Sequence, residues 1–249
     1  METEKIIKDL QEFAIDQQDI ITQKNNHKTD PLGDGISSLE LIRISGSDID
    51  VVNAARVSYG KVSETLSERD AKLINFLIEH DHTSPFEHNQ FSFRVKAPLY
   101  VQRQWMRHRM NSYNEISYRY VQAPLEFYIP QVWRQQDMLN KQSSFGVLDT
   151  STESAQIYKA ALETAGKAYE QLLALGVCRE QARGLLPMCT YTEFIFTCNL
   201  HSLMHFIRLR THPGAQYEIR VYAEQMLTIA EQYFPASLQA FKNKMSKKQ

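Results

Sequence analysis

Glycine is scarce in this sequence of 249 residues. The nine glycines are about half of the number expected from the usual frequency of roughly 7%. None of them stands in a G-x-G-x-x-G or G-x-x-x-x-G-K-[ST] pattern, in which glycine lets backbone amides approach phosphate. The sequence therefore excludes a dinucleotide-fold fingerprint and a P-loop, so something other than these glycine motifs must hold any nucleotide that binds.

Cysteine is scarce too, and neither sign of charge is in excess. Cys178, Cys189 and Cys198 are odd in number and have no C-x-x-C spacing, which argues against a structural zinc site or a disulfide framework and favours reduced thiols. A formal net charge of −1 argues against a surface used as a whole for nucleic acid or membrane binding. The acidic first twenty residues lack the apolar region of a secretory signal, and no apolar run could span a bilayer. We therefore expect a cytoplasmic protein without a membrane segment.

The length suits one large domain or two small ones. We expect residues 1–36 to form an acidic appendage, in which apolar residues from Ile6 to Ile20 permit an amphipathic helix and 29–35 reads as a linker. Residues 37–240 would form the main domain. Residues 241–249, which contain four lysines, would form a solvated basic tail.

The hydrophobic patterns of the main domain mix strands and helices without βαβ alternation. Apolar runs predict a strand over 38–44, and Phe91, Phe93 and Val95 alternate with polar residues in a half-buried strand. Helical spacing covers 48–59, and Ser67 with Asp70 resembles a capping box that opens a helix ending near residue 80. A helix is expected over 99–109, a polar loop after it, and mostly helix beyond 150 with a strand near 190–198. This order predicts an α+β fold with a mixed or antiparallel sheet.

Basic residues are concentrated between positions 94 and 120. This segment has six arginines or lysines and a single acid, Glu115, and Arg103 and Arg107 would share one helix face. A solvated, salt-bridged face would explain such a helix without any ligand. However, the loop that follows adds Ser112, Asn114, Ser117 and several tyrosines, which are suitable groups for holding a phosphate, a sugar and a base edge.

The same segment resembles the flavin-dependent thymidylate synthases. Arg107-His108-Arg109 followed after seven residues by Ser117 matches their RHRx7S signature. The resemblance extends over much of 48–235, through the strings NAARVSY (53–59), HTSPFEH (82–88), FRVKAPLYVQRQWMRHR (93–109), EFYIP (126–130), ARGLLP (182–187), NLHSLMHFIRLR (199–210) and AQYEIR (215–220). Several motifs in the same order make a chance match improbable.

This resemblance implies a methyltransferase that converts dUMP to dTMP in pyrimidine deoxynucleotide biosynthesis. Methylenetetrahydrofolate would be the carbon donor, FAD the redox cofactor and NADPH the reductant. The family fold is a single α+β domain that assembles as a homotetramer with shared active sites. The partners would thus be small molecules and other copies of the chain.

The resemblance also assigns roles to individual residues. The positions that match dUMP-binding residues are Gln104, Arg107, Glu115, Ser117, Tyr118, Arg119, Arg183 and Arg210. Those that match FAD-contacting residues are Ser84, Arg107, His108, Arg109, Glu115, Asn199, His201 and His205, with His82 and Glu87 near the flavin and folate. Arg210 would contact the uracil and help to ionise its N3.

Elementary chemistry agrees with these roles in outline. A cation at Arg210 would stabilise negative charge on the pyrimidine, although an arginine at a helix C-terminus can also serve only the helix dipole. Ser117 has no base beside it in the sequence, so we assign it to binding and not to attack. Cys189 is the one cysteine worth weighing as a nucleophile, but it also fits a helix end within the core. We expect that no cysteine attacks the substrate, and that the cofactor carries the redox chemistry.

Two other classes of function stay open at this point. His80, Asp81, His82 and His88 could ligate a metal in a phosphohydrolase, and His201 with His205 raises the same question, although the spacing is not diagnostic. Histidines placed at a helix C-terminus, where they interact favourably with the helix dipole, would explain the first group without a metal. Alternatively, the basic stretch 94–120 with Tyr113, Tyr118 and Tyr120 could bind RNA, with a steep salt dependence. A bound flavin would discriminate the enzyme from both.

Overall fold

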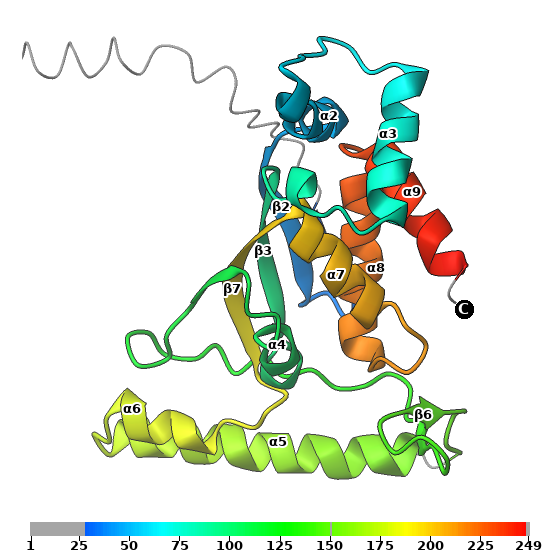
Figure 1. Ribbon diagram of the computed structural model, residues 1–249. Coiled ribbons are helices and arrows are strands. Elements are labelled where there is room, and N and C mark those ends of the chain that lie inside the picture. Colours follow the sequence, from blue (N-terminus) through cyan, green and yellow to red (C-terminus); the bar gives the residue numbers. More distant parts are fainter. Residues whose placement is uncertain (1–27, 150, 248–249) are drawn as a thin grey trace, which may run out of the picture.

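A five-stranded antiparallel sheet lies at the centre of the computed structural model, which describes residues 28–149 and 151–247 (Figure 1). Its strands lie in the order β1 (Lys28–Thr29), β2 (Ser38–Ser45), β3 (Gln90–Pro98), β7 (Tyr191–Asn199) and β4 (Ser112–Glu115). A separate hairpin pairs β5 (Gln135–Gln136) with β6 (Ser144–Phe145). The antiparallel pairing confirms the predicted α+β class.

Helices lie beside this sheet and beyond its ends (Figure 1). The α-helices are α2 (Asp48–Arg56), α3 (Glu68–Glu79), α4 (Leu99–Trp105), α5 (Ser151–Ala174), α6 (Arg179–Ala182), α7 (Leu200–Arg210), α8 (Tyr217–Glu231) and α9 (Pro235–Ser246). The described residues also form the short 3₁₀ turns η1 (Val57–Tyr59), η2 (Ser84–Phe86) and η3 (Arg183–Leu185). Figure 1 shows α7 and α8 beside the sheet, with α3 and α9 next to these two helices. The long α5 lies with α6 beyond the end of the sheet that is away from α2. None of the helices in the described part of the chain has the length and apolar character needed to cross a bilayer.

Aromatic side chains of the two central strands form the core. Phe93 of β3 lies opposite Phe196 of β7, and both are fully buried. Trp105 of α4 lies among these side chains and is stacked on Phe206 of α7, with ring centroids 4.8 Å apart. The predicted alternation of β3 is confirmed, except that Ser92 is also buried and its hydroxyl lies 2.9 Å from that of Thr197.

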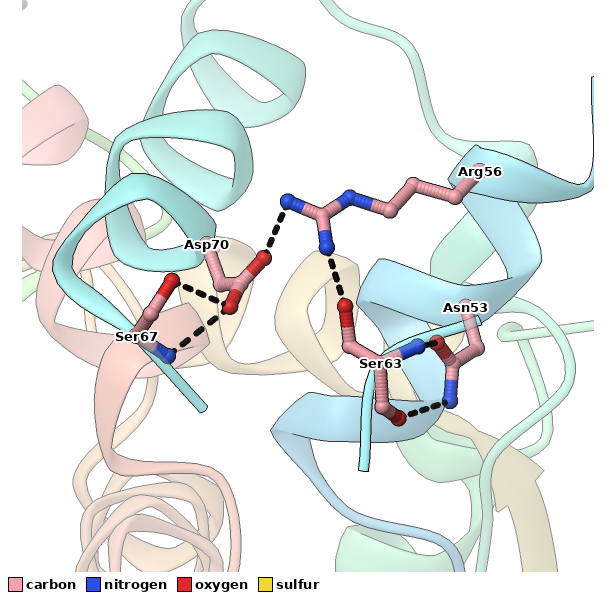
Figure 2. Close-up of polar contacts among 5 residues, drawn as sticks. All are labelled: Asn53, Arg56, Ser63, Ser67 and Asp70. Atoms are coloured by element: carbon pink, nitrogen blue, oxygen red, sulfur yellow. Dashed lines mark hydrogen bonds and ion pairs between the residues drawn. The ribbon is translucent and has the colours of Figure 1, made fainter. Parts of the chain in front are cut away.

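The capping box predicted for Ser67 and Asp70 is present at the start of α3. Asp70 accepts hydrogen bonds from the Ser67 backbone N–H (2.8 Å) and the Ser67 hydroxyl (2.6 Å). Figure 2 shows that the Arg56 guanidinium bridges this carboxylate and the hydroxyl of Ser63. The Ser67 hydrogen bonds and the Arg56 cation lower the pKa of Asp70, although burial opposes them. A charged carboxylate thus joins α2 to α3 across the loop that contains Ser63.

The segment that resembles a linker is part of the fold. Thr29 pairs with Leu39 in the sheet, and Leu32 is buried. The Asp30 carboxylate accepts hydrogen bonds from the backbone N–H groups of Gly33 (3.1 Å) and Gly35 (2.7 Å). The linker interpretation of 29–35 is therefore wrong, because these local bonds and the burial of Leu32 fix the segment. The amphipathic helix expected within residues 6–20 lies outside the described residues.

The solvated-tail interpretation is also wrong for residues 241–247. Phe241 is buried in the core, and α9 continues to Ser246. The Lys244 ammonium donates to the Ile78 carbonyl at the end of α3 (2.6 Å) and pairs with Asp81 (2.6 Å). Lys244, which belongs to a run of charge in the sequence, thus satisfies carbonyls at the end of α3.

Candidate functional site

The arginine-rich helix ends earlier than its spacing predicts. Helix α4 stops at Trp105, so Arg107, His108 and Arg109 lie beyond it. The Tyr113 hydroxyl lies 3.0 Å from the Trp105 carbonyl and 2.8 Å from the His108 carbonyl, positions from which it can donate to either oxygen. The predicted stacking of Arg103 and Arg107 on one helix face is therefore wrong. Instead, Arg107 and Arg109 are exposed on an irregular turn.

Arg210 lies against this turn, although it is more than a hundred residues away in sequence. It is the last residue of α7 and is half-buried. Its Nε donates to His108 Nε2 (3.0 Å), its Nη2 to the Gln104 carbonyl (3.1 Å) and its Nη1 to Gln104 Oε1 (3.5 Å). These bonds use three of the five N–H groups of a guanidinium. Within the described residues the other two have no protein acceptor, so they are available to a ligand.

Arg210 and His108 differ in charge at neutral pH. Burial, together with the neighbouring Arg210 and His205, lowers the pKa of His108 to about 4. His108 is therefore neutral near pH 7, and it accepts from Arg210 on Nε2 and carries its proton on Nδ1. Burial also lowers the pKa of Arg210, but a guanidinium remains charged at neutral pH. The pair thus presents one fixed cation beside a neutral imidazole.

The polar loop predicted after the helix contains a strand. Residues Ser112–Glu115 form β4 at the sheet edge, because β7 offers them a backbone ladder. Glu115 is fixed at the end of this strand, where its carboxylate accepts from Gln102 Nε2 (2.9 Å) and the Thr192 hydroxyl (2.6 Å). The Ser117 hydroxyl accepts from the Arg119 backbone N–H (3.3 Å).

Three of the predicted substrate residues lie on the side of α5 and α6. Tyr118 is buried in a small cluster with Tyr169, and its hydroxyl donates to the Tyr191 carbonyl (2.5 Å). Arg119 is exposed, 3.9 Å from the Glu180 carboxylate, and Arg183 is exposed in η3. In this chain the hydroxyl of Tyr118 therefore supports the loop, while the two arginines stay accessible.

A cavity of about 290 Å³ lies between α3, α7 and α9. Leu77, Phe86 and Met204 contribute apolar walls, and His82, His201 and His205 contribute polar edges. The last three all belong to the predicted flavin and folate set.

Other members of that set lie around the start of α7. The Asn199 side chain caps α7 by accepting from the Ser202 N–H (2.8 Å), and His201 Nδ1 lies 3.6 Å from Glu87. Ser84 begins η2 and is exposed. Burial, Arg208 and His201 lower the pKa of His205, which favours its neutral form.

The histidines do not converge on a metal position. Phe76 packs against both His80 and His82, with centroids 4.3 and 5.7 Å away. Asp81, the residue between them, pairs with Lys244. Across 28–149 and 151–247, no group of three or more histidine, cysteine or acidic side chains is arranged to hold a metal ion. The phosphohydrolase alternative thus has no geometric support.

The structure therefore gathers many of the predicted residues into three groups, of which the first two adjoin where the rings of His108 and His205 lie 5.9 Å apart. Gln104, His108 and Arg210 meet, the residues of α7 and η2 lie around the cavity, and Arg119 and Arg183 lie beside α6. Gln216, which bonds to the Gln104 side chain, was missed as a site residue. Its only signal in the sequence is its place in the string AQYEIR.

A fixed arginine, a neutral histidine and exposed arginines in a glycine-poor segment form a site suited to an anionic ligand that is held by side chains. Comparisons with known proteins identify the family. Residues 40–236 match the family described as thymidylate synthase complementing protein (Thy1). The chain belongs to this family, and it is an enzyme of the flavin-dependent thymidylate synthase type.

The relatives cover most of the chain. A flavin-dependent thymidylate synthase of Thermosipho africanus is 44% identical over 205 residues, 82% of this chain and 90% of the relative. A protein of the same name from Thermus thermophilus is 47% identical over 203 residues, 82% of this chain and 74% of the relative. The crystal structure of the UMP/dUMP methylase PolB from Streptomyces cacaoi with 5-Br dUMP has a TM-score of 0.78 and 37% identity. The match covers 83% of this chain and 95% of PolB.

Proposed function

We propose that this enzyme methylates dUMP to dTMP, with methylenetetrahydrofolate as carbon donor, FAD as cofactor and NADPH as reductant. The observation that carries the proposal is Arg210, whose guanidinium is fixed by Gln104 and His108 and keeps two N–H groups for a ligand. A pyrimidine beside it would be favoured in its N3-ionised form, because a nearby cation lowers the pKa of an acid. PolB, a structural relative, is a UMP/dUMP methylase.

The residues around α7 fit a flavin. The apolar walls of the cavity suit a planar ring system, and the neutral His205 offers a hydrogen bond at its edge. Exposed Arg107 and Arg109 suit a diphosphate, since guanidinium forks pair with phosphate oxygens. When bound, the flavin supplies the hydride needed to turn a transferred methylene group into a methyl group.

We further propose that copies of the chain share their active sites in a homotetramer. A flavin dinucleotide is larger than the cavity of about 290 Å³. Arg107 and Arg109, which would hold its diphosphate, do not line the cavity. A neighbouring copy that supplies Arg107 and Arg109 would complete the site.

The protein would use no cysteine nucleophile. Cys189 is buried in the turn before β7, not at a helix end, and burial raises the pKa of its thiol. Burial likewise raises the pKa of Cys198. A thiol with a raised pKa forms little thiolate, and the thiolate is the form that would be needed to attack a pyrimidine ring.

We expect Cys189→Ala to keep dTMP formation within about threefold of the wild-type rate, because the thiol carries no step. The measurement is steady-state turnover with circular dichroism as a check on folding, and Cys178→Ala serves as the exposed control. Abolished turnover in a folded Cys189→Ala variant would contradict the cysteine-free mechanism.

The decisive experiment is the visible spectrum of the purified protein. We expect flavin absorbance that bleaches when NADPH is added without oxygen, and dTMP formation once dUMP and methylenetetrahydrofolate are supplied. Colourless, folded protein that takes up no added FAD would overturn the proposal. Under that outcome, RNA binding with a steep salt dependence would be tested next.

A further inference from the structure

A buried carboxylate outside the predicted site is connected to it by side chains. Glu218, in the first turn of α8, is only 2% exposed. Its Oε1 accepts from Arg134 Nη2 (2.9 Å) and lies 3.4 Å from the Tyr128 hydroxyl. Its Oε2 accepts from Gln216 Nε2 (2.9 Å). Burial and the charge of Glu218 raise the pKa of Tyr128, so this hydroxyl remains protonated and can donate.

The contact with Gln216 continues to Arg210. Gln216 Oε1 accepts from Gln104 Nε2, and Gln104 Oε1 accepts from Arg210 Nη1 (3.5 Å). Two amides therefore stand between the carboxylate of Glu218 and the guanidinium of Arg210. We call this series, Glu218-Gln216-Gln104-Arg210, the relay.

Only one orientation of the two amides gives every group of the relay a hydrogen-bond partner. An ionised carboxylate only accepts hydrogen bonds and a guanidinium only donates them, whereas each amide does both. Glu218 thus requires the NH₂ end of Gln216, and Arg210 requires the oxygen end of Gln104. If either amide flipped, two donors or two acceptors would face each other, at the cost of unpaired polar groups.

We propose that Glu218 is a positioning residue that orients Arg210 toward the pyrimidine through Gln216 and Gln104, an inference that rests on the proposed function. Glu218 is not among the predicted substrate contacts, so its effect would be on the orientation of residues that would touch the substrate. Its negative charge fixes the polarity of both amides, and that polarity fixes the edge of Gln104 that faces Arg210. Misplacement of an orienting group by about 1 Å can cost on the order of 10²-fold in rate.

A structural role for Glu218 predicts a different result. The Arg134–Glu218 ion pair holds the segment that follows Phe127 against α8, where Phe127 itself forms an isolated β-bridge with Thr190. Breaking a buried pair is destabilising. The test therefore starts with Gln216→Leu, which interrupts the relay but leaves that ion pair intact. Gln216 is the N-cap residue of α8 and its side chain makes no capping bond, so its replacement removes no cap.

We expect Gln216→Leu to stay folded, with a melting temperature a few degrees below that of the wild type because Gln104 and Glu218 each lose a hydrogen-bond partner, and to lose on the order of 10- to 100-fold in kcat. KM for dUMP should change by less than about threefold, because the interaction of Arg210 grows as charge develops. Glu218→Gln should show a similar loss of kcat. The double variant should be no slower than Gln216→Leu alone, because both changes interrupt the same relay. Glu224→Gln, a carboxylate exposed on the same helix, is the matched control and should keep wild-type kinetics.

Each outcome decides the inference. A wild-type kcat in Gln216→Leu overturns it, as does a double variant whose losses multiply, since a structural role gives independent effects. If Glu218→Gln does not fold, kcat and KM of Gln216→Leu decide alone. Failure of the wild-type protein to form dTMP would instead overturn the proposed function, so the two failures are distinguishable.

Discussion

Arg210→Ala is expected to lower kcat/KM for dUMP by about 10²- to 10³-fold, the range typical of removing a group that stabilises developing charge. The alanine leaves no cation beside the pyrimidine, while the cavity around α7 is unchanged. Flavin absorbance should therefore persist in the purified variant. Steady-state dTMP formation and the visible spectrum together check this result.

Two further variants serve as comparisons for Arg210→Ala. Arg210→Lys keeps a positive charge but loses the fork that binds Gln104 and His108, so it should recover only part of the rate. Arg69→Ala removes an exposed arginine from α3 and should behave as wild type. Loss of flavin in Arg210→Ala would show that the arginine holds the cofactor and not the substrate.

Trp105→Ala is expected to lower the free energy of unfolding by about 3–5 kcal/mol, the usual cost of truncating a buried aromatic side chain. Trp105 is fully buried. Its ring packs on Phe206 at 4.8 Å and against Phe194 and Tyr222 at 5.4 and 5.7 Å. Urea unfolding followed by circular dichroism measures the loss.

The chain offers a matched control for this change. Trp133, the second tryptophan, is partly buried and packs on Tyr158 beside the β5–β6 hairpin. Because fewer contacts are lost there, Trp133→Ala should lower the free energy of unfolding clearly less than Trp105→Ala does. Equal losses in the two variants would contradict the central place of Trp105. Since α4 carries both Trp105 and Gln104, the first variant should also weaken dUMP turnover.

Local patterns predicted those elements whose causes are local. The Ser67 and Asp70 pair marks the start of α3, because a capping box satisfies the free N–H groups of a helix start. Alternation through Phe91, Phe93 and Val95 identifies β3, since one face of a strand is buried. The RHRx7S string identified the family, because its residues stand close together in the sequence.

Patterns failed where a distant partner decides the conformation. The string SYNE of β4 is polar, and it becomes a strand because β7 supplies the hydrogen bonds. Helix α4 ends at Trp105, near the point where Arg210 binds the Gln104 carbonyl. The lysines of α9 are ordinary surface residues by spacing, yet Lys244 donates to the end of α3.

The sequence by itself determined the α+β class and the family, and its shortage of glycine predicts that side chains hold any anion that binds. Only the tertiary structure decided which of those side chains meet. Arg210 reaches Gln104 and His108 across 106 and 102 residues of sequence, and such a contact depends on how α7 packs against the end of α4. The relay from Glu218 follows from the same packing, because the pairing of donors and acceptors is settled only when distant groups lie within hydrogen-bond distance.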